Sequence, residues 1–135
     1  MKPILQRVIL GYLALTSVVV GLWAQFGPRS FYDTFPGFGH IWVAVDGPFN
    51  EHLIRDVGGL NLALAAVLLL AAVSLERSLV LAACVASLLY GIPHVVYHVL
   101  NRSSLGTGDF VAVIGGLALF ALLPFGLLLT RGRRD

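Results

Sequence analysis

Residues 50–74 have the sequence NEHLIRDVGGLNLALAAVLLLAAVS, in which a cluster of charged and titratable side chains precedes an almost wholly apolar run. As an α-helix, this stretch exceeds the roughly 20 residues that cross the apolar core of a bilayer. Three further stretches of similar character occupy residues 4–26, 78–101 and 109–130. The pattern predicts an all-α, integral membrane four-helix bundle, formed by a single four-span domain over residues 1–135.

The composition also indicates a membrane protein. Hydrophobic residues make up 58% of the chain and charged residues 12%, whereas soluble domains contain about 25% charged residues. A water-soluble core of this chain length could not bury so much apolar surface. We therefore predict a multi-pass protein of the bacterial inner (cell) membrane, with the lipid bilayer as its main partner. The chain carries no nucleic-acid-binding motif, and we expect no nucleic acid as a partner.

Basic residues concentrate at one end of the predicted bundle. Six of the nine lie at the two chain ends or beside the turn at residues 75–77, namely Lys2, Arg7, Arg77, Arg131, Arg133 and Arg134. Because basic loops stay on the cytoplasmic side of a membrane, both termini are predicted to be cytoplasmic.

A long aromatic loop then lies on the outer side, between the first and second predicted helices. It carries Phe31, Tyr32, Phe35, Phe38, Trp42 and Phe49. Aromatic side chains are typical of the headgroup interface. Two alternatives stay open: a loop that follows the membrane surface, with a short helix or strand around residues 40–45, or a lid over a pocket between helices.

The second predicted helix begins with paired charges. Asn50 is a suitable N-cap, and Glu51 suits the positive end of the helix dipole. Glu51 and Arg55 are four residues apart, as are His52 and Asp56, so each pair shares a helix face. Within a membrane-proximal first turn, these pairs can neutralise each other.

Small and amide side chains follow these charges. Gly58 and Gly59 either let another helix approach closely or leave room for a ligand. Asn61 lies one turn deeper, and we expect it to point toward the first or fourth predicted helix.

The third predicted helix carries a polar stripe within an arc of about 100° on a helical wheel. Its members are Tyr90, His94, Tyr97, His98 and Asn101. Because the second and third helices are joined by a tight turn, they should pack antiparallel. Their charged beginning and polar end would then meet at the outer side, which predicts an outward-facing His/Glu/Asp/Arg pocket between them.

Ionisable groups at membrane depth are costly and often functional. As catalytic candidates we consider His94, His98, Glu51 and Asp56, with an imidazole moving a proton and a carboxylate orienting it. Ligand-binding candidates are His52, Arg55, Tyr90, Tyr97, Asn101 and Trp42. Metal-ligand candidates are His94, His98 and His52, since neutral imidazole binds transition metals or haem iron. A purely structural network, in which both stripe histidines bond the acids and tyrosines, is a further alternative.

Two segments resemble those of known proteins: FYDTFPGFGHIWV at residues 31–43 and GPFNEHLIRDVGGLNLAL at residues 47–64. They resemble segments of small uncharacterised four-helix membrane proteins of actinobacteria, and the layout is more distantly similar to the DoxX-like group. The resemblance covers most of the chain from residue 29 to residue 101. DoxX proteins are associated with thiol and quinone redox systems. A direct thiol role would need more than the single Cys84, so no functional residue is carried over.

These observations lead to one main functional hypothesis and one alternative. The main hypothesis is a membrane protein that binds a small ligand in the outward-facing pocket or acts as an accessory subunit of a membrane complex, with a homo-oligomer also compatible. The alternative is a metal- or His-dependent membrane enzyme of the isomerase or oxidoreductase type. Whether any reaction is catalysed stays open at this point.

Overall fold

The computed structural model describes residues 1–131 and contains four long helices. They are α1 (Pro3–Phe26), α3 (Glu51–Ser74), α4 (Arg77–Leu100) and α5 (Thr107–Arg131), each within two residues of its predicted range. All four are long and apolar enough to cross a membrane. The predicted all-helical bundle is confirmed. Arg133 and Arg134, used above to predict the orientation, lie outside the described residues.

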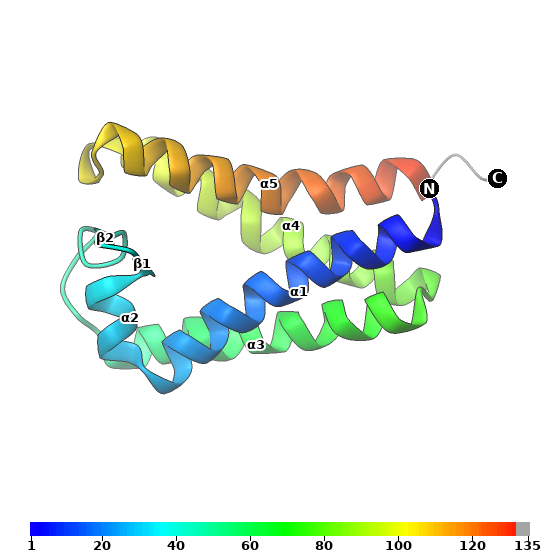
Figure 1. Ribbon diagram of the computed structural model, residues 1–135, viewed down its shortest axis with the longest axis horizontal. Coiled ribbons are helices and arrows are strands. Elements are labelled where there is room, and N and C mark those ends of the chain that lie inside the picture. The colour runs from blue at the N-terminus through cyan, green and yellow to red at the C-terminus, as the bar shows by residue number, and fades with distance from the viewer. Residues whose placement is uncertain (132–135) are drawn as a thin grey trace.

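The long helices form two antiparallel pairs, in which α1 packs along α3 and α4 packs along α5 (Figure 1). Two glycines allow α1 and α3 to approach closely. A Cβ atom on Gly58 would lie 2.5 Å from the backbone nitrogen of Gln25, and one on Gly21 would lie 2.8 Å from Cγ of Leu62. Gly58 therefore brings α3 against α1, and this contact fixes which face of α3 is buried.

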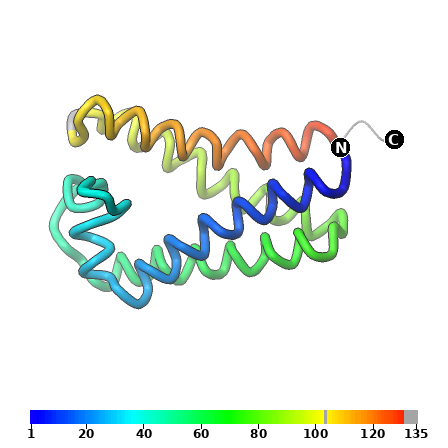
Figure 2. Tube along the Cα trace, viewed as in Figure 1, coloured from blue at the N-terminus to red at the C-terminus, as the bar shows by residue number. Residues whose placement is uncertain are grey.

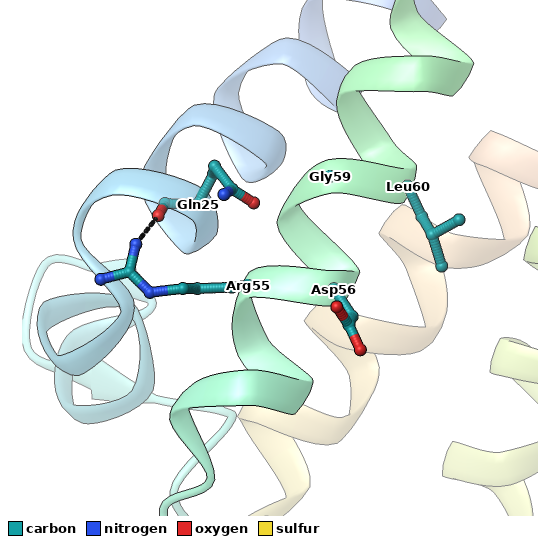
Figure 3. A pocket seen from close by; sticks show the side chains of 5 residues that line it. All are labelled: Gln25, Arg55, Asp56, Gly59 and Leu60. Carbon is teal, nitrogen blue, oxygen red and sulfur yellow. Dashed lines mark hydrogen bonds between the residues drawn. The ribbon is translucent and has the colours of Figure 1, made fainter.

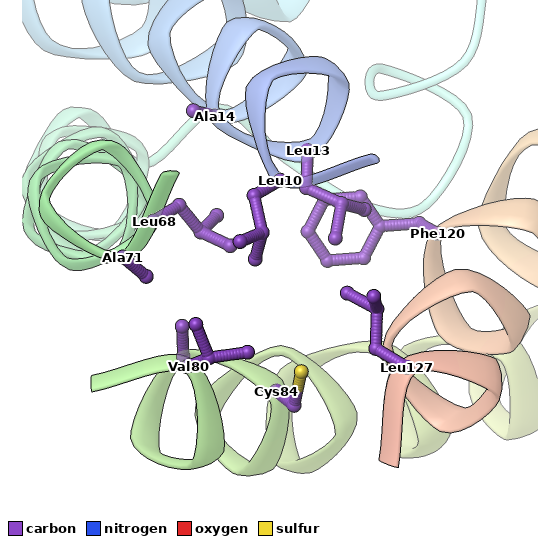
Figure 4. Packing of buried hydrophobic residues seen from close by; sticks show 10 residues of the cluster. Leu10, Leu13, Ala14, Leu68, Ala71, Val80, Cys84, Phe120 and Leu127 are labelled. Carbon is purple, nitrogen blue, oxygen red and sulfur yellow. The ribbon is translucent and has the colours of Figure 1, made fainter. Parts of the chain in front are cut away.

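The larger apolar core joins both pairs near the end of the bundle that holds the N-terminus (Figure 4). All four long helices contribute fully buried side chains to it, among them Leu10, Leu13, Leu68, Val80 and Leu127. At most 33% of each candidate span is buried inside the protein. The other residues of these spans are partly or fully exposed, which is compatible with helices that present apolar side chains to lipid.

Arg7 fastens α1 to the end of α3. Its Nη1 donates to the main-chain oxygens of Ala72 and Val73, at 2.6 and 2.7 Å. The last carbonyls of a helix lack partners within it and form the negative end of its dipole, so a guanidinium is favourable there. Leu75 ends α3 in the left-handed conformation, at φ 55°. The predicted tight connection to the next helix, which starts at Arg77, is confirmed.

The outer segment, residues 27–50, contains a helix and a small hairpin. Helix α2 (Pro28–Thr34) precedes the strands β1 (Pro36–Gly37) and β2 (His40–Ile41), which pair antiparallel. A short helix or strand was expected around residues 40–45, and the two-residue strand β2 lies there, whereas α2 was not predicted. Its sequence signal is Pro28, a residue favoured in the first turn of a helix. The short 3-10 helix η1 (Arg102–Ser104) joins α4 to α5.

This outer segment lies between the two helix pairs, at the end of the bundle opposite the N-terminus (Figure 2). On one side, Phe31 of α2 packs in a buried apolar cluster with Ala24 of α1 and Ile54 of α3. On the other side, Trp42 contacts Asp109 in the first turn of α5. The outer segment therefore bridges the α1–α3 pair and the α4–α5 pair.

Candidate functional site

The charged residues at the start of α3 pair with one another along that helix. Arg55 Nε donates to Glu51 Oε1 at 2.9 Å, and His52 Nε2 lies 3.3 Å from Asp56 Oδ2. Asn50 Oδ1 accepts a hydrogen bond from the Leu53 amide, which confirms the predicted N-cap. Both predicted ion pairs are confirmed, and all four of their side chains are substantially exposed.

Beside these pairs, α3 and α1 border an open hollow of about 490 Å³, which we call the Arg55 hollow (Figure 3). It is lined by Gln25, Arg55, Asp56, Gly59 and Leu60. The Arg55 guanidinium also donates to the main-chain oxygen of Gln25, in the last turn of α1. The polar residues of α3 thus border a hollow against α1. Space for a ligand beside Gly59 was one of the two alternatives predicted above, but the sequence did not indicate that α1 would form its other side.

His94 and His98 form a histidine pair on α4. Their Nε2 atoms are 3.2 Å apart, their ring centroids are 5.0 Å apart, and the ring planes differ by 29°. His98 is 8% exposed, and His94 is partly buried. Tyr90 meets the His94 ring edge-on, and Tyr97 meets the His98 ring in the same manner. Local spacing along α4 brings these four rings together, because Tyr90, His94 and His98 follow one another at four-residue intervals and Tyr97 directly precedes His98.

The structure does not bring the α3 charges to the histidine pair. Among residues 1–131, no carboxylate lies within 4.0 Å of either imidazole. Nor do three or more His, Cys, Asp or Glu side chains gather closely enough to hold a metal ion. His52, Glu51 and Asp56 therefore do not join His94 and His98, contrary to the expected convergence. The physical reason is that α3 turns its Gly58 face to α1, while the outer segment separates the two helix pairs.

Asn61 makes the polar contact between the pairs. Its side chain is 4% exposed, and Nδ2 lies 2.9 Å from the Val57 carbonyl and 3.4 Å from the Tyr90 hydroxyl. We expected Asn61 to point to the first or fourth predicted helix, which are α1 and α5. That expectation is wrong, since its partner Tyr90 lies on α4, the third predicted helix. A polar series consequently runs from Asn61 through Tyr90 to His94 and His98.

The outermost members of the predicted stripe do not face the bundle. Tyr97 is 45% exposed, and Asn101 is exposed and donates to the Tyr97 carbonyl. Pro93 lies within α4, which continues to Leu100. The stripe therefore has two parts. Tyr90, His94 and His98 are buried or partly buried, whereas Tyr97 and Asn101 are exposed.

Asp109 holds the outer segment to α5, a role that the sequence analysis did not assign. Its Oδ1 accepts a hydrogen bond from Trp42 Nε1 at 2.9 Å and lies 2.7 Å from His40 Nδ1. Trp42, a predicted ligand-binding residue, thus has a partner within the protein. A signal for Asp109 was present in the sequence, because it is the only acid within a long apolar stretch.

Comparisons of the chain with protein-family models, with curated proteins and with solved structures gave no match. The resemblance to DoxX-like proteins therefore stays a prediction. What the geometry offers is two separate polar places at the same end of the bundle. One is the Arg55 hollow, in which Arg55 is paired with Glu51 and Asp56 with His52, and the other is the histidine pair.

Proposed function

We propose that the chain is a multi-pass membrane protein that binds a small ligand at the histidine pair, reached from the outer side. The observation that carries this proposal is the set of partners of His94 and His98. Within the described part of the chain, their ring nitrogens hydrogen-bond only with each other, and their ring contacts are with tyrosines of the same helix.

The proposed orientation places both termini in the cytoplasm of a bacterial cell. The N-terminus, the turn between α3 and α4 and the end of α5 lie at one end of the bundle (Figure 1). Lys2, Arg7 and Arg77 lie there too, as the positive-inside rule requires of a cytoplasmic end. The outer segment, Asp109 and the last turn of α4 then lie on the outer side, where a water-borne ligand would arrive.

A structural role would need the histidines to connect helices. Other polar side chains of this protein do so: Arg7 joins α1 to α3, Asn61 joins α3 to α4, and Trp42 joins the outer segment to α5. Because the hydrogen bond of the histidine pair lies within α4, and residues 1–131 show none from it to another element, its contribution to stability should be small. Titratable groups at membrane depth are costly, so residues retained there without a structural partner favour a role in binding.

Binding is also favoured over histidine–carboxylate catalysis. In that chemistry a carboxylate orients the imidazole and stabilises its protonated form. The acids nearest in the predicted topology, Glu51 and Asp56, are instead paired with Arg55 and His52. The histidine pair can donate and accept hydrogen bonds, and it can supply electron pairs to a ligand.

Chemical modification and unfolding of the purified protein test this proposal. Diethyl pyrocarbonate should modify His94 in the folded protein, and mass spectrometry would follow its rate against His52, whose side chain is 88% exposed. His94→Ala removes a partly buried ring, and we expect it to lower the free energy of unfolding by about 1 kcal/mol or less. A histidine pair that resists modification, together with a strongly destabilised His94→Ala protein, would show a structural role instead.

If the chain is instead an accessory subunit of a membrane complex, purification of the same protein variants should give a different result. A larger membrane complex should co-purify with the wild-type chain in mild detergent, and it should also co-purify with His94→Ala and His98→Ala. The histidine pair would then be dispensable for assembly. This result would indicate that the function depends on the helix surfaces that face away from the bundle.

A further inference from the structure

We propose that the ligand of the histidine pair is a divalent late first-row transition metal ion, chelated by Nε2 of His94 and Nε2 of His98. This inference rests on the proposed function, since it names the chemical class of the ligand. It is carried by the relative placement of the two imidazole rings, which two distances describe.

The first distance is that between the coordinating atoms. The Nε2 atoms are 3.2 Å apart. With metal–nitrogen bonds of about 2.0–2.1 Å, two imidazoles bound at angles between 90° and the tetrahedral value have nitrogens about 2.8–3.4 Å apart. The observed separation lies within this range. A linear two-coordinate ion would instead need the nitrogens about 4 Å apart, so this geometry disfavours it.

The second distance is that between the ring centroids, which is 5.0 Å. If both lone pairs point at one shared ion, the same bond lengths and angles place the centroids about 4.5–5.2 Å apart. A straight N–H···N hydrogen bond between the two rings would place them about 5.5 Å apart. The observed centroid separation lies within the range expected for two ligands of one ion and is shorter than a straight hydrogen bond would give.

The position on the helix supports the same conclusion. His94 and His98 are one turn apart on α4, which holds their backbones rigidly and lowers the cost of bringing both ligands to one ion. Both ring nitrogens that face each other are Nε2, and in their hydrogen bond one of them donates to the other. Metal binding would require the donated proton to move to Nδ1, so that both Nε2 lone pairs face the ion. Neutral imidazole is the form that binds metals.

The ligand set also indicates the kind of ion. Imidazole suits copper, zinc and nickel, and Cu²⁺ binds most tightly among the divalent ions of this series. Within residues 1–131, no third His, Cys, Asp or Glu completes the set. The bound ion would therefore keep exchangeable positions for water or a small anion, in contrast to the closed ligand shell of a structural zinc site.

Metal titration of the chelator-treated protein, purified through a tag without histidines, tests the proposal. Cu²⁺ and Zn²⁺ would be added separately to the protein in mild detergent, and affinity and stoichiometry would be measured by calorimetry. We expect one ion per chain, with Cu²⁺ bound more tightly than Zn²⁺. The electron paramagnetic resonance spectrum of bound Cu²⁺ should show coupling to two nitrogens.

Three variants locate the site. His94→Ala and His98→Ala should each weaken Cu²⁺ binding at least tenfold and remove one nitrogen from the spectrum. His52→Ala is the matched control, because His52 also faces a polar partner, Asp56, four residues away on a helix. It should leave the affinity unchanged. His98→Gln replaces His98→Ala if the smaller side chain prevents folding.

The outcomes separate this inference from the proposed function. Wild-type protein that binds Cu²⁺ no better than His94→Ala, or equal losses in His52→Ala, would overturn the metal site. If His94 is nevertheless accessible to diethyl pyrocarbonate and dispensable for stability, the proposal of a small-ligand site stands with a different ligand. If His94 is also inaccessible and needed for folding, both proposals fail.

Discussion

The polar side chains of the two helix pairs differ in their exposure and in their partners. In the α1–α3 pair, the charges at the start of α3 are exposed and satisfy one another, and Arg55 also binds a carbonyl at the end of α1. In the α4–α5 pair, His94 and His98 lie deeper and meet no opposite charge among the described residues. Paired and exposed charges near a membrane surface are therefore weaker evidence of function than two buried or partly buried imidazoles on one helix face.

The pairs also differ in how closely their helices approach. A Cβ on Gly58 would overlap the α1 backbone, whereas a Cβ on Gly91 of α4 would lie 3.5 Å from Cδ1 of Phe120 on α5, an ordinary contact. Backbone-to-backbone contact fixes the rotation of α3 about its axis. At Gly91 there is space for a Cβ, so the rotation of α4 does not depend on a glycine at this position.

Substitution of Gly58 should have the largest effect, because it removes the close α1–α3 contact that distinguishes this pair from the α4–α5 pair. Gly58→Ala forces α1 away from α3, and we expect it to lower the free energy of unfolding by about 1–3 kcal/mol. Unfolding in mixed detergent micelles, followed by circular dichroism, would measure this loss.

Two control glycines accompany that experiment. Gly59→Ala and Gly91→Ala add the same methyl group where the nearest atoms lie at 3.6 and 3.5 Å. Because alanine favours a helix over glycine by up to about 1 kcal/mol, these variants should be neutral or slightly stabilised. Equal destabilisation by all three substitutions would show that the α1–α3 contact is not specially close.

Removal of the Asp109 carboxylate tests the bridge between the pairs. Asp109→Ala deprives Trp42 and His40 of their shared acceptor, and we expect a loss of about 1–2 kcal/mol in local stability. Hydrogen exchange of residues 36–46, measured by mass spectrometry, should rise about tenfold, while exchange in the α1–α3 core stays unchanged.

Asp33→Asn is the matched control for that bridge. Asp33 pairs only with Arg29 on the same short helix, and both side chains are at least 40% exposed. Its exchange pattern should match that of wild type, since an exposed pair contributes little. Unchanged exchange in Asp109→Ala would mean that apolar packing alone holds the outer segment.

The smallest expected effect concerns the polar contact between α3 and α4. Tyr90→Phe removes the hydroxyl that lies 3.4 Å from Asn61 Nδ2. Hydrogen bonds between helices in membranes average about 0.6 kcal/mol, and this one is long, so we expect a loss of that size or less. Tyr97→Phe, at an exposed position of the same helix, should have no measurable effect. A larger loss in Tyr90→Phe would make the polar series a structural network.

Prediction from the sequence was most successful where a property depends on neighbours along the chain. The four long helices, the N-cap at Asn50 and the two ion pairs at the start of α3 all follow from local spacing. The meeting of the α3 charges with the histidines and the partner of Asn61 depended on helix rotation. A wheel identifies the polar face of a helix, but it does not identify the helix against which that face packs.

Hydropathy and helical spacing along the chain were enough to establish a bundle of four long apolar helices and a histidine pair on one helix face. The apolar length of a helix and the contact between side chains one turn apart depend only on nearby residues, so they do not change with the way the helices pack. Tertiary structure alone decided that α3 pairs with α1, that Asp109 receives Trp42, and that the charges of α3 stay apart from His94 and His98. These outcomes depend on the fit of one helix surface against another, such as the close approach at Gly58, which no single stretch of sequence contains.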